Sequence, residues 1–476
     1  MTSAPATSPI VLSAQEVAVA AGARVLNGAQ RTLESFSIDS RRIASGQCFI
    51  ALRGDRFDGA DFAAECLARG AAGVIVNRSA GIAPSLAAIS PSAAVLETDD
   101  TLVALQRLGR HVRRLSGARV TAITGSAGKT TTKEAAAEFL GDRYTVYRNP
   151  GNLNNHVGLP LSLLDLRMRP QMAVVELGMN HPGEIRTLVG LAEPDVRVWT
   201  NVGDAHIGHF ESAEGIADAK AEVLEGAGPA SLLVANADDA RVMARAAGFA
   251  GRTVTFGLDR GADVRAADVE DRGVDGTGAM VDTPAGRAHF NVPLIGRGNL
   301  MNVLAATAVA LEFEVPLEAV ADRASALRPG RHRGERVALR DGITLVDDSY
   351  NSSPSALVRT LEAVGRDRTH TRRVAVLGEM LELGAFAGDL HAECGRIAAA
   401  QSLARLVTVG GPAAERMAAA ARDAGMPADA VRHVPTSEDV LPLLPTLVAA
   451  GDLVLVKGSR GVRTDVVVER LVEEWR

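Results

Sequence analysis

The sequence is poor in cysteine, in aromatic residues and in long apolar runs, and each shortage excludes a class of protein. Three scattered cysteines among 476 residues, without metal-ligand spacing, are typical of reduced thiols in the cytosol. Aromatic residues make up 3% of the chain, so stacking platforms for single-stranded nucleic acid are not expected. No run of about 18 apolar residues occurs, and no basic flank precedes an apolar core at the N-terminus. We therefore expect a cytoplasmic protein without stable membrane insertion.

A large excess of charge of one sign is also missing. The chain has 51 basic and 57 acidic residues, a net charge of −6, which predicts no general affinity for nucleic acid or acidic membranes. Apolar residues make up 47% and charged residues 23%, which is ordinary for a globular protein. The length exceeds what a single core supports, so we expect about three domains. The predicted boundaries are 1–105, 106–325 and 326–476.

The strongest local signal is a glycine-rich turn between an apolar strand and a helix. Residues 120–123 are predicted to form a buried strand, and a helix is predicted to open at Lys133. The turn between them consists of Thr124, Gly125, Ser126, Ala127, Gly128, Lys129, Thr130 and Thr131. Glycines in such a turn let backbone N–H groups face a phosphate, and the helix N-terminus adds partial positive charge. The segment predicts a cradle for a nucleoside triphosphate.

Two side chains of the turn suit that ligand. Lys129 can reach the outer phosphates, and the Thr130 hydroxyl can ligate Mg²⁺. The general P-loop pattern has a glycine where this chain has Ile123. A chance Gly-Lys-Thr in a loop is the alternative, but the order of strand, turn and helix favours the nucleotide site.

Short strands alternate with helices along the rest of the chain. In the first section we predict strands at 47–52 and 73–76, helices at 62–69 and 101–115, and a loop at 83–94. In the middle section, buried strands at 172–178 and 196–202 predict a doubly wound parallel sheet. Residues 257–286 are either an antiparallel excursion or a mobile insertion. In the last section, strands ending near 348, 379, 411 and 458 predict a second open sheet, with ligands beyond the strand ends.

Several polar residues are functional candidates, each with a plainer alternative. Glu176, at the end of a strand, can hold the Mg²⁺ of a nucleotide or be a surface charge. His206, and more weakly His209, can bind a metal or phosphate, although loop histidines are usually structural. Lys220 lies in an amphipathic segment, and the local pattern by itself favours a surface lysine.

Two further polar segments follow predicted strands. The amide-rich loop 149–156 suits a polar ligand, or its side chains satisfy their own backbone. Asp347 and Asp348 are costly side by side unless they pair with cations, such as an incoming ammonium group. Capping of a helix by Ser353 ahead of Pro354 is compatible with either role.

Taken together, these segments resemble the Mur ligase superfamily over essentially the whole chain. The shortened P-loop at 124–131 is that superfamily's version, which accounts for the missing glycine. The stretches 38–41 with 49–54, 347–351 and 377–384 resemble the branch that joins D-alanyl-D-alanine to UDP-N-acetylmuramoyl-tripeptide. The Asp-Asn-Pro-Arg motif usual in the sibling that adds the third residue is not found.

The resemblance implies a fold and a reaction. The fold would be α/β in three domains: a central P-loop doubly wound sheet, an N-terminal α/β domain for the UDP substrate, and a C-terminal Rossmann-like domain for the dipeptide. The activity would be that of an ATP-dependent amide ligase acting through an acyl phosphate, and we expect a monomer. The last domain would swing onto the central one, with hinges near 312–316 or 328–330.

The resemblance also implies roles for residues that the local pattern left undecided. Thr130 and Glu176 would hold one Mg²⁺, and His206 would hold a second together with Lys220 in carbamylated form. The catalytic residues would be Lys129, Lys220, His206 and Arg331. The ATP site would add Asn299, Asn302 and Asp347 to the residues of the turn and Arg331. The substrate site would comprise Ser40, Arg41, Asn154, Asn155, Asn351, Lys457 and Ser459.

Two of these assignments depart from the family pattern or are ambiguous. Gly298 stands where the family commonly has a histidine before the first asparagine of the adenine-side motif. Arg331 has basic neighbours at His332, Arg333 and Arg336, which are alternatives for the residue that reaches the γ-phosphate. Three other functions stay open: a sibling ligase with another amine acceptor, a P-loop switch that hydrolyses nucleotide for a macromolecular partner, and an inactive ligase kept as a binding module.

Overall fold

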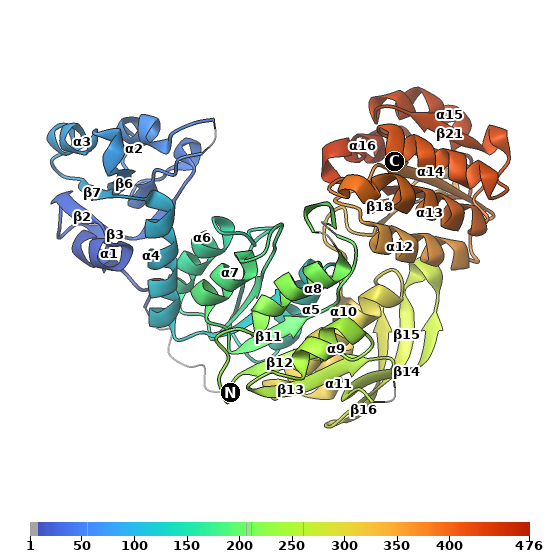
Figure 1. The fold of residues 1–476 in the computed structure, drawn as a ribbon, viewed down its shortest axis with the longest axis horizontal. Coiled ribbons are helices and arrows are strands. Elements are labelled where there is room, and N and C mark those ends of the chain that lie inside the picture. The colour runs from blue at the N-terminus through green and yellow to red at the C-terminus, as the bar shows by residue number, and fades with distance from the viewer. Residues whose placement is uncertain (1–7, 55, 206, 211, 260) are drawn as a thin grey trace.

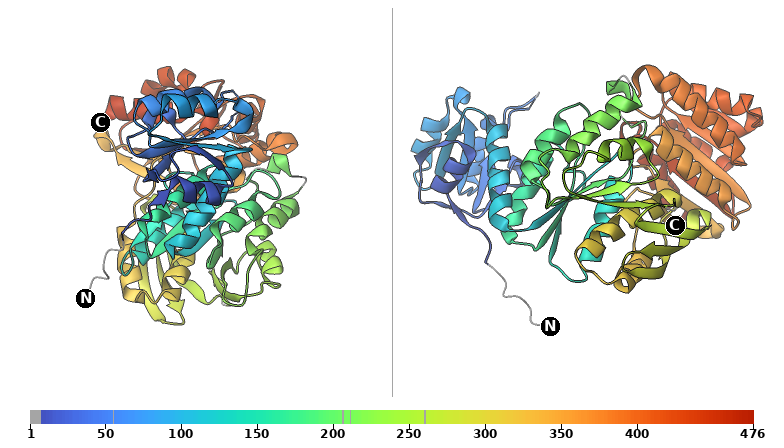
Figure 2. Two further views of the ribbon diagram at one scale, coloured as in Figure 1. Left: turned by 90° about the vertical axis from the view of Figure 1, so that its left-hand side faces the viewer. Right: turned by 60° about the horizontal axis from the view of Figure 1, so that its bottom comes forward.

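The computed structural model describes residues 8–54, 56–205, 207–210, 212–259 and 261–476. Within these ranges the elements gather into three groups in chain order, each built on a β-sheet with helices packed against it (Figure 1). The first and last groups stand on the same side of the central one. The right-hand view of Figure 2 shows the first and last groups at opposite ends of the central one. The predicted α/β class with a central sheet between two smaller ones is confirmed.

The N-terminal sheet has the order β2-β7-β6-β5-β4, parallel except for β2. Its strands are β2 (Arg24–Asn27), β4 (Ser35–Ser37), β5 (Gln47–Ile50), β6 (Gly73–Asn77) and β7 (Ala94–Thr98), and β1 (Leu12–Ser13) pairs with β3 (Thr32–Leu33) beside it. The helices are α1 (Ala14–Ala21), α2 (Ala63–Ala68) and α3 (Ala83–Ile89). The predicted loop at 83–94 is wrong, because its first half is α3. Pro84 is tolerated in the first turn of that helix, where a backbone N–H has no partner to lose.

The central sheet has the order β16-β15-β14-β13-β12-β11-β8-β10-β9. Its strands are β8 (Arg119–Thr124), β9 (Val146–Arg148), β10 (Met172–Glu176), β11 (Val196–Trp199), β12 (Leu232–Asn236), β13 (Arg252–Gly257), β14 (Val264–Asp271), β15 (Thr277–Thr283) and β16 (Gly286–Val292). Strands β8 to β14 pair in parallel, whereas β15 and β16 are antiparallel additions. The antiparallel interpretation of residues 257–286 is therefore confirmed.

Helices lie on both faces of this sheet (Figure 1). They are α4 (Thr101–Ser116), α5 (Lys129–Leu140), α6 (Gly158–Leu164), α7 (Glu184–Ala192), α8 (Ala213–Ala221), α9 (Ala240–Ala246), α10 (Arg297–Glu312) and α11 (Leu317–Ala326). Helix α4 packs against α1 on one side and against α6 and α7 on the other, so it joins the first group to the second. The helix after the glycine-rich turn begins at Lys129 rather than at the predicted Lys133. Gly128 of the turn is the residue that precedes the helix, so the last residues of the predicted turn form its first turn.

The C-terminal sheet has the order β17-β18-β22-β19-β20-β21, with only the edge strand β17 antiparallel. Its strands are β17 (Glu335–Ala338), β18 (Thr344–Asp348), β19 (Arg372–Gly378), β20 (Arg405–Val409), β21 (Val431–Val434) and β22 (Asp452–Lys457). The helices are α12 (Pro354–Arg366), α13 (Ala387–Ala400), α14 (Pro412–Asp423), α15 (Leu444–Leu447) and α16 (Asp465–Trp475). All four strand ends predicted for this section are confirmed.

Helices cover both faces of the sheets and bury their strands. Strands β10, β12 and β22 are buried along their full length, as expected for parallel strands covered from both sides. Their apolar side chains supply the cores, which leaves the polar residues that follow each strand at the sheet edge. Among the described residues, no helix combines the length and the apolar character that a membrane crossing requires.

Candidate active site

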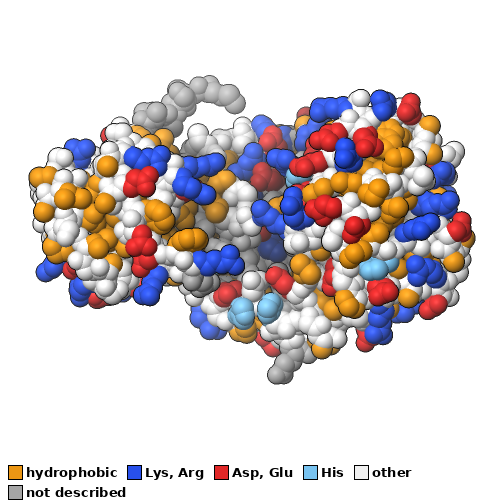
Figure 3. Space-filling model, turned by 90° about the horizontal axis from the view of Figure 1, so that it is seen from above, with side chains coloured by type: hydrophobic (Ala, Val, Ile, Leu, Met, Phe, Trp, Pro, Cys, Tyr) orange, Lys and Arg blue, Asp and Glu red, His pale blue; other side chains and the backbone are white. Residues whose placement is uncertain are grey.

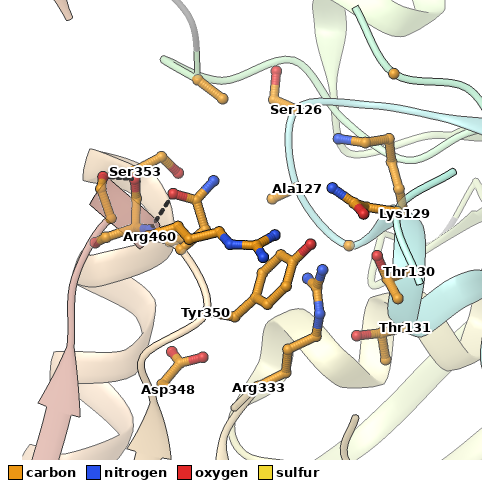
Figure 4. Close-up of a pocket in the computed structure, with 18 of the residues that line it drawn as sticks. Ser126, Ala127, Lys129, Thr130, Thr131, Arg333, Asp348, Tyr350, Ser353 and Arg460 are labelled. Carbon is orange, nitrogen blue, oxygen red and sulfur yellow. Dashed lines mark hydrogen bonds between the residues drawn. The ribbon is translucent and has the colours of Figure 1, made fainter. Parts of the chain in front are cut away.

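A cavity of about 620 Å³ lies where the glycine-rich turn of the central sheet faces the strand ends of the C-terminal sheet. Polar side chains from both sheets line it, as Figure 4 shows for the turn on one side and for the segments after β18 and β22 on the other. Ligands of open α/β sheets bind beyond the carboxyl ends of the strands, and this cavity lies beyond two such edges at once.

The turn itself is built around two glycines. Gly125 and Gly128 have φ values of 148° and 85°, a region that side-chain-bearing residues rarely adopt. A Cβ on Gly125 would overlap Thr200, and a Cβ on Gly128 would overlap the Asn302 side chain. The Asn201 side chain braces the turn from behind, accepting from the Ala127 N–H at 2.9 Å and donating to the Ala127 carbonyl at 3.0 Å. The turn is therefore rigid.

Lys129 and Thr130 open helix α5 at the bottom of the cavity. The Lys129 ammonium donates to the Gly125 carbonyl at 2.8 Å. Burial lowers the pKa of Lys129, and the nearby charge of Glu176 opposes that shift. A lysine at the first turn of a helix, folded back over the cradle, is placed to bind the outer phosphates of a nucleotide.

Glu176 sits at the end of β10, beside the turn because β10 pairs in parallel with β8. Its carboxylate accepts a hydrogen bond from the Thr130 hydroxyl at 2.8 Å and another from the Asn154 amide at 2.8 Å. It is 3% exposed, which rules out the interpretation as a surface charge. The hydroxyl and carboxylate oxygens, side by side beneath a phosphate cradle, match the oxygen donors that Mg²⁺ prefers.

The amide-rich loop is held from below by a buried lysine. Lys133 on α5 is fully buried and donates to the Asn149 carbonyl at 2.7 Å and to the Gly151 carbonyl at 3.2 Å. Asn154 donates to Glu176, whereas the Asn155 side chain accepts from the N–H of Gly158, the first residue of helix α6, at 2.8 Å. Both asparagines line the cavity. Asn155 therefore fits the turn interpretation of the loop, and the ligand interpretation stays a prediction.

Lys220 lies on α8 and is 2% exposed, so the surface interpretation favoured by its local pattern fails. Burial lowers the pKa of Lys220 well below its usual value, and the charge of Lys129 lowers it further. Burial and the Lys129 charge thus both favour the neutral amine, the form that reacts with CO₂. His206 lies outside the described residues. Within the described ranges, no group of three or more His, Cys, Asp or Glu side chains is arranged to hold a metal ion.

On the C-terminal side, Lys457 ends β22 and joins the segment after β18. Its ammonium donates to Asp348 at 2.7 Å and to the Asn351 carbonyl at 2.9 Å. Ser459 accepts from the Leu381 N–H at 3.0 Å. Lys457, Asn351 and Ser459 all line the cavity. The cation expected for the paired aspartates is thus supplied by the protein itself.

The two aspartates have different surroundings. Asp348 lines the cavity, whereas Asp347 is buried behind it. Asp347 bonds to His332 Nδ1 at 2.7 Å and accepts from the Ser349 hydroxyl at 2.6 Å. Ser353 precedes α12 but makes no side-chain capping bond. Asp347 therefore anchors the segment around His332 to the end of β18.

The basic segment at 331–336 sends Arg333, not Arg331, into the cavity. Arg331 is exposed and outside the lining, whereas Arg333 stacks on the Tyr350 ring at 3.9 Å from its centroid. In Figure 4 Arg333 extends toward Lys129 and Thr130. His332 has a φ of 60°, a turn that the spacing of basic residues does not reveal. Tyr350 was missed as an individual cavity residue, although it lies in a segment that the sequence singled out.

The adenine-side asparagines lie on the first turns of α10. Asn299 donates to the Ile295 carbonyl at 2.9 Å, and Asn302 donates to Asn299 at 3.0 Å. Both line the cavity with Gly298, and an added Cβ at Gly298 would lie 3.3 Å from Arg359. Of the turn residues, 126–131 line the cavity, whereas Thr124 and Gly125 lie behind the lining.

Ser40 and Arg41 belong to the N-terminal group, outside the cavity lining. Arg41 is largely exposed and pairs with Asp39 at 2.9 Å, which lowers the pKa of Asp39 to about 2. Viewed from above, Lys and Arg side chains border the hollow between the first and last groups (Figure 3). A basic border suits an anionic ligand.

Comparison with known protein families gives matches over most of the chain. Residues 32–118 match the description "Mur ligase family, catalytic domain", 123–310 match "Mur ligase middle domain", and 332–460 match "Mur ligase, glutamate ligase domain". A curated relative from Bacillus subtilis is 33% identical over 444 residues, covering 93% of this chain and 94% of its own length. One from Escherichia coli is 32% identical over 452 residues, covering 94% and 96%. Both are called UDP-N-acetylmuramoyl-tripeptide–D-alanyl-D-alanine ligase.

Solved structures agree with the sequence relatives. MurF from Acinetobacter baumannii superposes with a TM-score of 0.87 at 29% identity, covering 98% of this chain and 100% of that one. The MurF ligase of Thermotoga maritima in complex with ADP gives a TM-score of 0.79 at 29% identity, covering 92% and 97%.

Proposed function

The chain belongs to the Mur ligase family, and from this premise we propose that it joins D-alanyl-D-alanine to UDP-N-acetylmuramoyl-tripeptide at the expense of ATP. The observation that carries the proposal is the single cavity lined by a phosphate-binding turn on one side and by the ends of β18 and β22 on the other. A ligase needs its activating nucleotide and its amine acceptor within reach of one carboxylate. A carboxylate bound in this cavity would have the phosphate-binding turn on one side and the ends of β18 and β22 on the other.

The first step activates the tripeptide. Its terminal carboxylate attacks the γ-phosphorus of ATP, and the bond between the β- and γ-phosphates breaks. ADP is the leaving group, and the tripeptide becomes an acyl phosphate. Lys129 and Arg333 neutralise the charge that develops on the phosphoryl oxygens. Thr130 and Glu176 would hold a Mg²⁺ ion, which supplies charge neutralisation between the phosphates when bound. Arg333 takes the role first expected of Arg331.

The second step forms the amide. The neutral amine of the dipeptide attacks the acyl carbon, inorganic phosphate leaves, and the amine loses a proton. Asn351, Lys457 and Ser459, after β18 and β22, form our proposed acceptor side. Acyl phosphates hydrolyse in water, so the last domain (326–476) would close over the central one (106–325), with the hinges at 312–316 or 328–330.

The proposal includes the modification of Lys220. A neutral, buried amine can take up CO₂, and the resulting carbamate would add a negative charge near Lys129. With His206 it would form the second metal site. Ser40 and Arg41, in the N-terminal domain (1–105), would bind the uridine diphosphate group. Because the cavity forms within one chain, a monomer would be sufficient for the reaction. The UDP-linked precursor implies a cytoplasmic location.

A panel of amine acceptors tests the proposal against a sibling ligase. Purified protein receives ATP, Mg²⁺ and UDP-N-acetylmuramoyl-tripeptide with either D-alanyl-D-alanine, lysine, diaminopimelate or glutamate, and products are identified by mass. We expect a product only with the dipeptide. Ligation of a single amino acid instead would replace the proposal with the sibling activity, and an inactive binding module would give no product with any acceptor.

A further inference from the structure

The side chains of two arginines in the cavity, Arg333 and Arg460, make no hydrogen bond or ion pair with any described residue, whereas the other cations of the lining are engaged. The basic side chains of the lining are Lys129, Arg333, Arg359, Lys457 and Arg460. Lys129 folds over the turn, Arg359 donates to the Ser355 carbonyl at 3.0 Å, and Lys457 is paired with Asp348 at 2.7 Å. Within the described part of the chain, the Arg460 guanidinium makes no hydrogen bond or ion pair. It lies 5.8 Å from the centroid of the Tyr350 ring.

The backbone that carries Arg460 is nevertheless fixed. Arg460 opens a short 3₁₀ turn, 460–462, directly after β22. On one side, the Ser459 N–H donates to the Glu379 carbonyl at 3.3 Å and the Ser459 hydroxyl accepts from Leu381. On the other, Ser437 donates to the Val462 carbonyl at 2.8 Å. From this anchored turn the guanidinium extends past Tyr350 into the cavity (Figure 4).

A fixed backbone with a free guanidinium in a cavity indicates a binding site for an anion. Guanidinium groups bind carboxylates through two parallel hydrogen bonds, and such charge-assisted bonds are about twice as strong as neutral ones. The proposed acceptor is a dipeptide whose far end carries a free carboxylate. Lys457 is a poor partner for that carboxylate because Asp348 already neutralises its charge.

We infer that Arg460 binds the terminal carboxylate of the incoming dipeptide and so selects an acceptor with a free C-terminus. The inference rests on the proposed function. Arg460 belongs to the same strand end as Lys457 and Ser459, whereas the phosphate side has its own cations in Lys129 and Arg333. A phosphate oxygen is the other anion with the required chemistry, and the experiment separates the two.

The test compares two acceptors in two proteins. Wild type and Arg460→Gln are each assayed with D-alanyl-D-alanine and with D-alanyl-D-alaninamide, which lacks the carboxylate charge. We expect wild type to prefer the free acid by roughly 10- to 100-fold in kcat/KM, the range of one charge-assisted pair. In Arg460→Gln the preference should fall to within about 3-fold, with unchanged KM for ATP, and Arg460→Lys should give an intermediate preference.

Arg463→Gln is the matched control, because Arg463 is an exposed arginine in the same loop but outside the cavity lining. It should keep the wild-type preference. If Arg460→Gln keeps the preference, or shifts only the KM for ATP, the inference is wrong even though the ligase activity stands. If wild type ligates neither peptide, the proposed function fails, and the inference fails with it. Unfolding temperatures of all variants verify that the exposed substitutions leave the fold intact.

Discussion

Substitution of Gly208 by alanine should weaken ligation through a contact between the central and C-terminal sheets. The Gly208 N–H donates to the Glu382 carbonyl at 2.9 Å. A Cβ on Gly208 would lie 2.6 Å from the Gly384 nitrogen and 2.7 Å from the Glu382 oxygen. Both neighbours are backbone atoms, which cannot rotate away as a side chain could. The φ of Gly208 is not positive, so alanine adds no backbone strain and the overlap acts alone.

The size of the effect follows from that overlap. Heavy atoms in contact normally lie about 3.5 Å apart, so the two loops must separate by roughly 0.8 Å. Overpacking of this kind costs about 1–3 kcal/mol, which corresponds to a roughly 5- to 150-fold loss in the population of the contacting arrangement. Because the loop 382–384 also borders the cavity, we expect a loss of that order in kcat/KM for D-alanyl-D-alanine.

Steady-state kinetics with varied dipeptide, together with equilibrium ATP binding, measure the effect. ATP binding should stay near the wild-type value, because the glycine-rich turn belongs to the central sheet. Gly190→Ala is the matched control: Gly190 lies inside α7 with no atom within 4 Å of an added Cβ, so alanine there should leave activity unchanged. Wild-type kcat/KM in Gly208→Ala would refute the reasoning that the contact positions the two sides of the cavity.

Three further predictions concern buried groups. Glu176→Gln should lower kcat about 100-fold and raise the Mg²⁺ concentration needed for half-maximal rate, because it removes a carboxylate charge beside Thr130. A half-maximal Mg²⁺ concentration equal to that of wild type would contradict this prediction. Burial lowers the pKa of His391, so on acidification the unfolded chain binds this proton at a higher pH than the folded protein does. The free energy of unfolding should therefore fall as pH drops below about 6.5, and His391→Asn should flatten that slope in denaturant titrations at several pH values. Burial raises the pKa of the Cys394 thiol to about 12, and it also raises the pKa values of Cys48 and Cys66. At pH 8 a disulfide reagent should therefore label none of the three thiols in the native protein and all three in denaturant. Rapid labelling of the native protein would contradict this prediction and show that the buried sites open.

The sequence predicts best where the chemistry lies within one short segment. The order of apolar strand, glycine-rich turn and helix identifies the phosphate cradle, because each part has a local signal. The helix α3 was missed because Pro84 and Ser85 are loop signals in general, yet Pro84 stands in the first helical turn, where it costs nothing. Local signals therefore gave the strands and the turn, but misjudged one short helix.

The rest of the site depends on long-range packing. Lys220 looks like a surface residue in its own segment, and only the packed fold buries it. The choice of Arg333 over Arg331 depends on the left-handed turn at His332, which the Asp347 carboxylate holds in place. The spacing of residues in the sequence does not predict the contact between His332 and Asp347. Likewise, Asp348 and Lys457 are more than a hundred positions apart and meet only because β18 pairs with β22.

Phosphate release from ATP tests the central claim most directly. The protein is incubated with ATP, Mg²⁺ and UDP-N-acetylmuramoyl-tripeptide, with and without D-alanyl-D-alanine, and phosphate and product mass are measured together. The account predicts sustained release only when both substrates are present, with a product that carries the added dipeptide. Release that is indifferent to D-alanyl-D-alanine, or that responds instead to a macromolecular partner, would contradict the ligase and favour a nucleotide-driven switch.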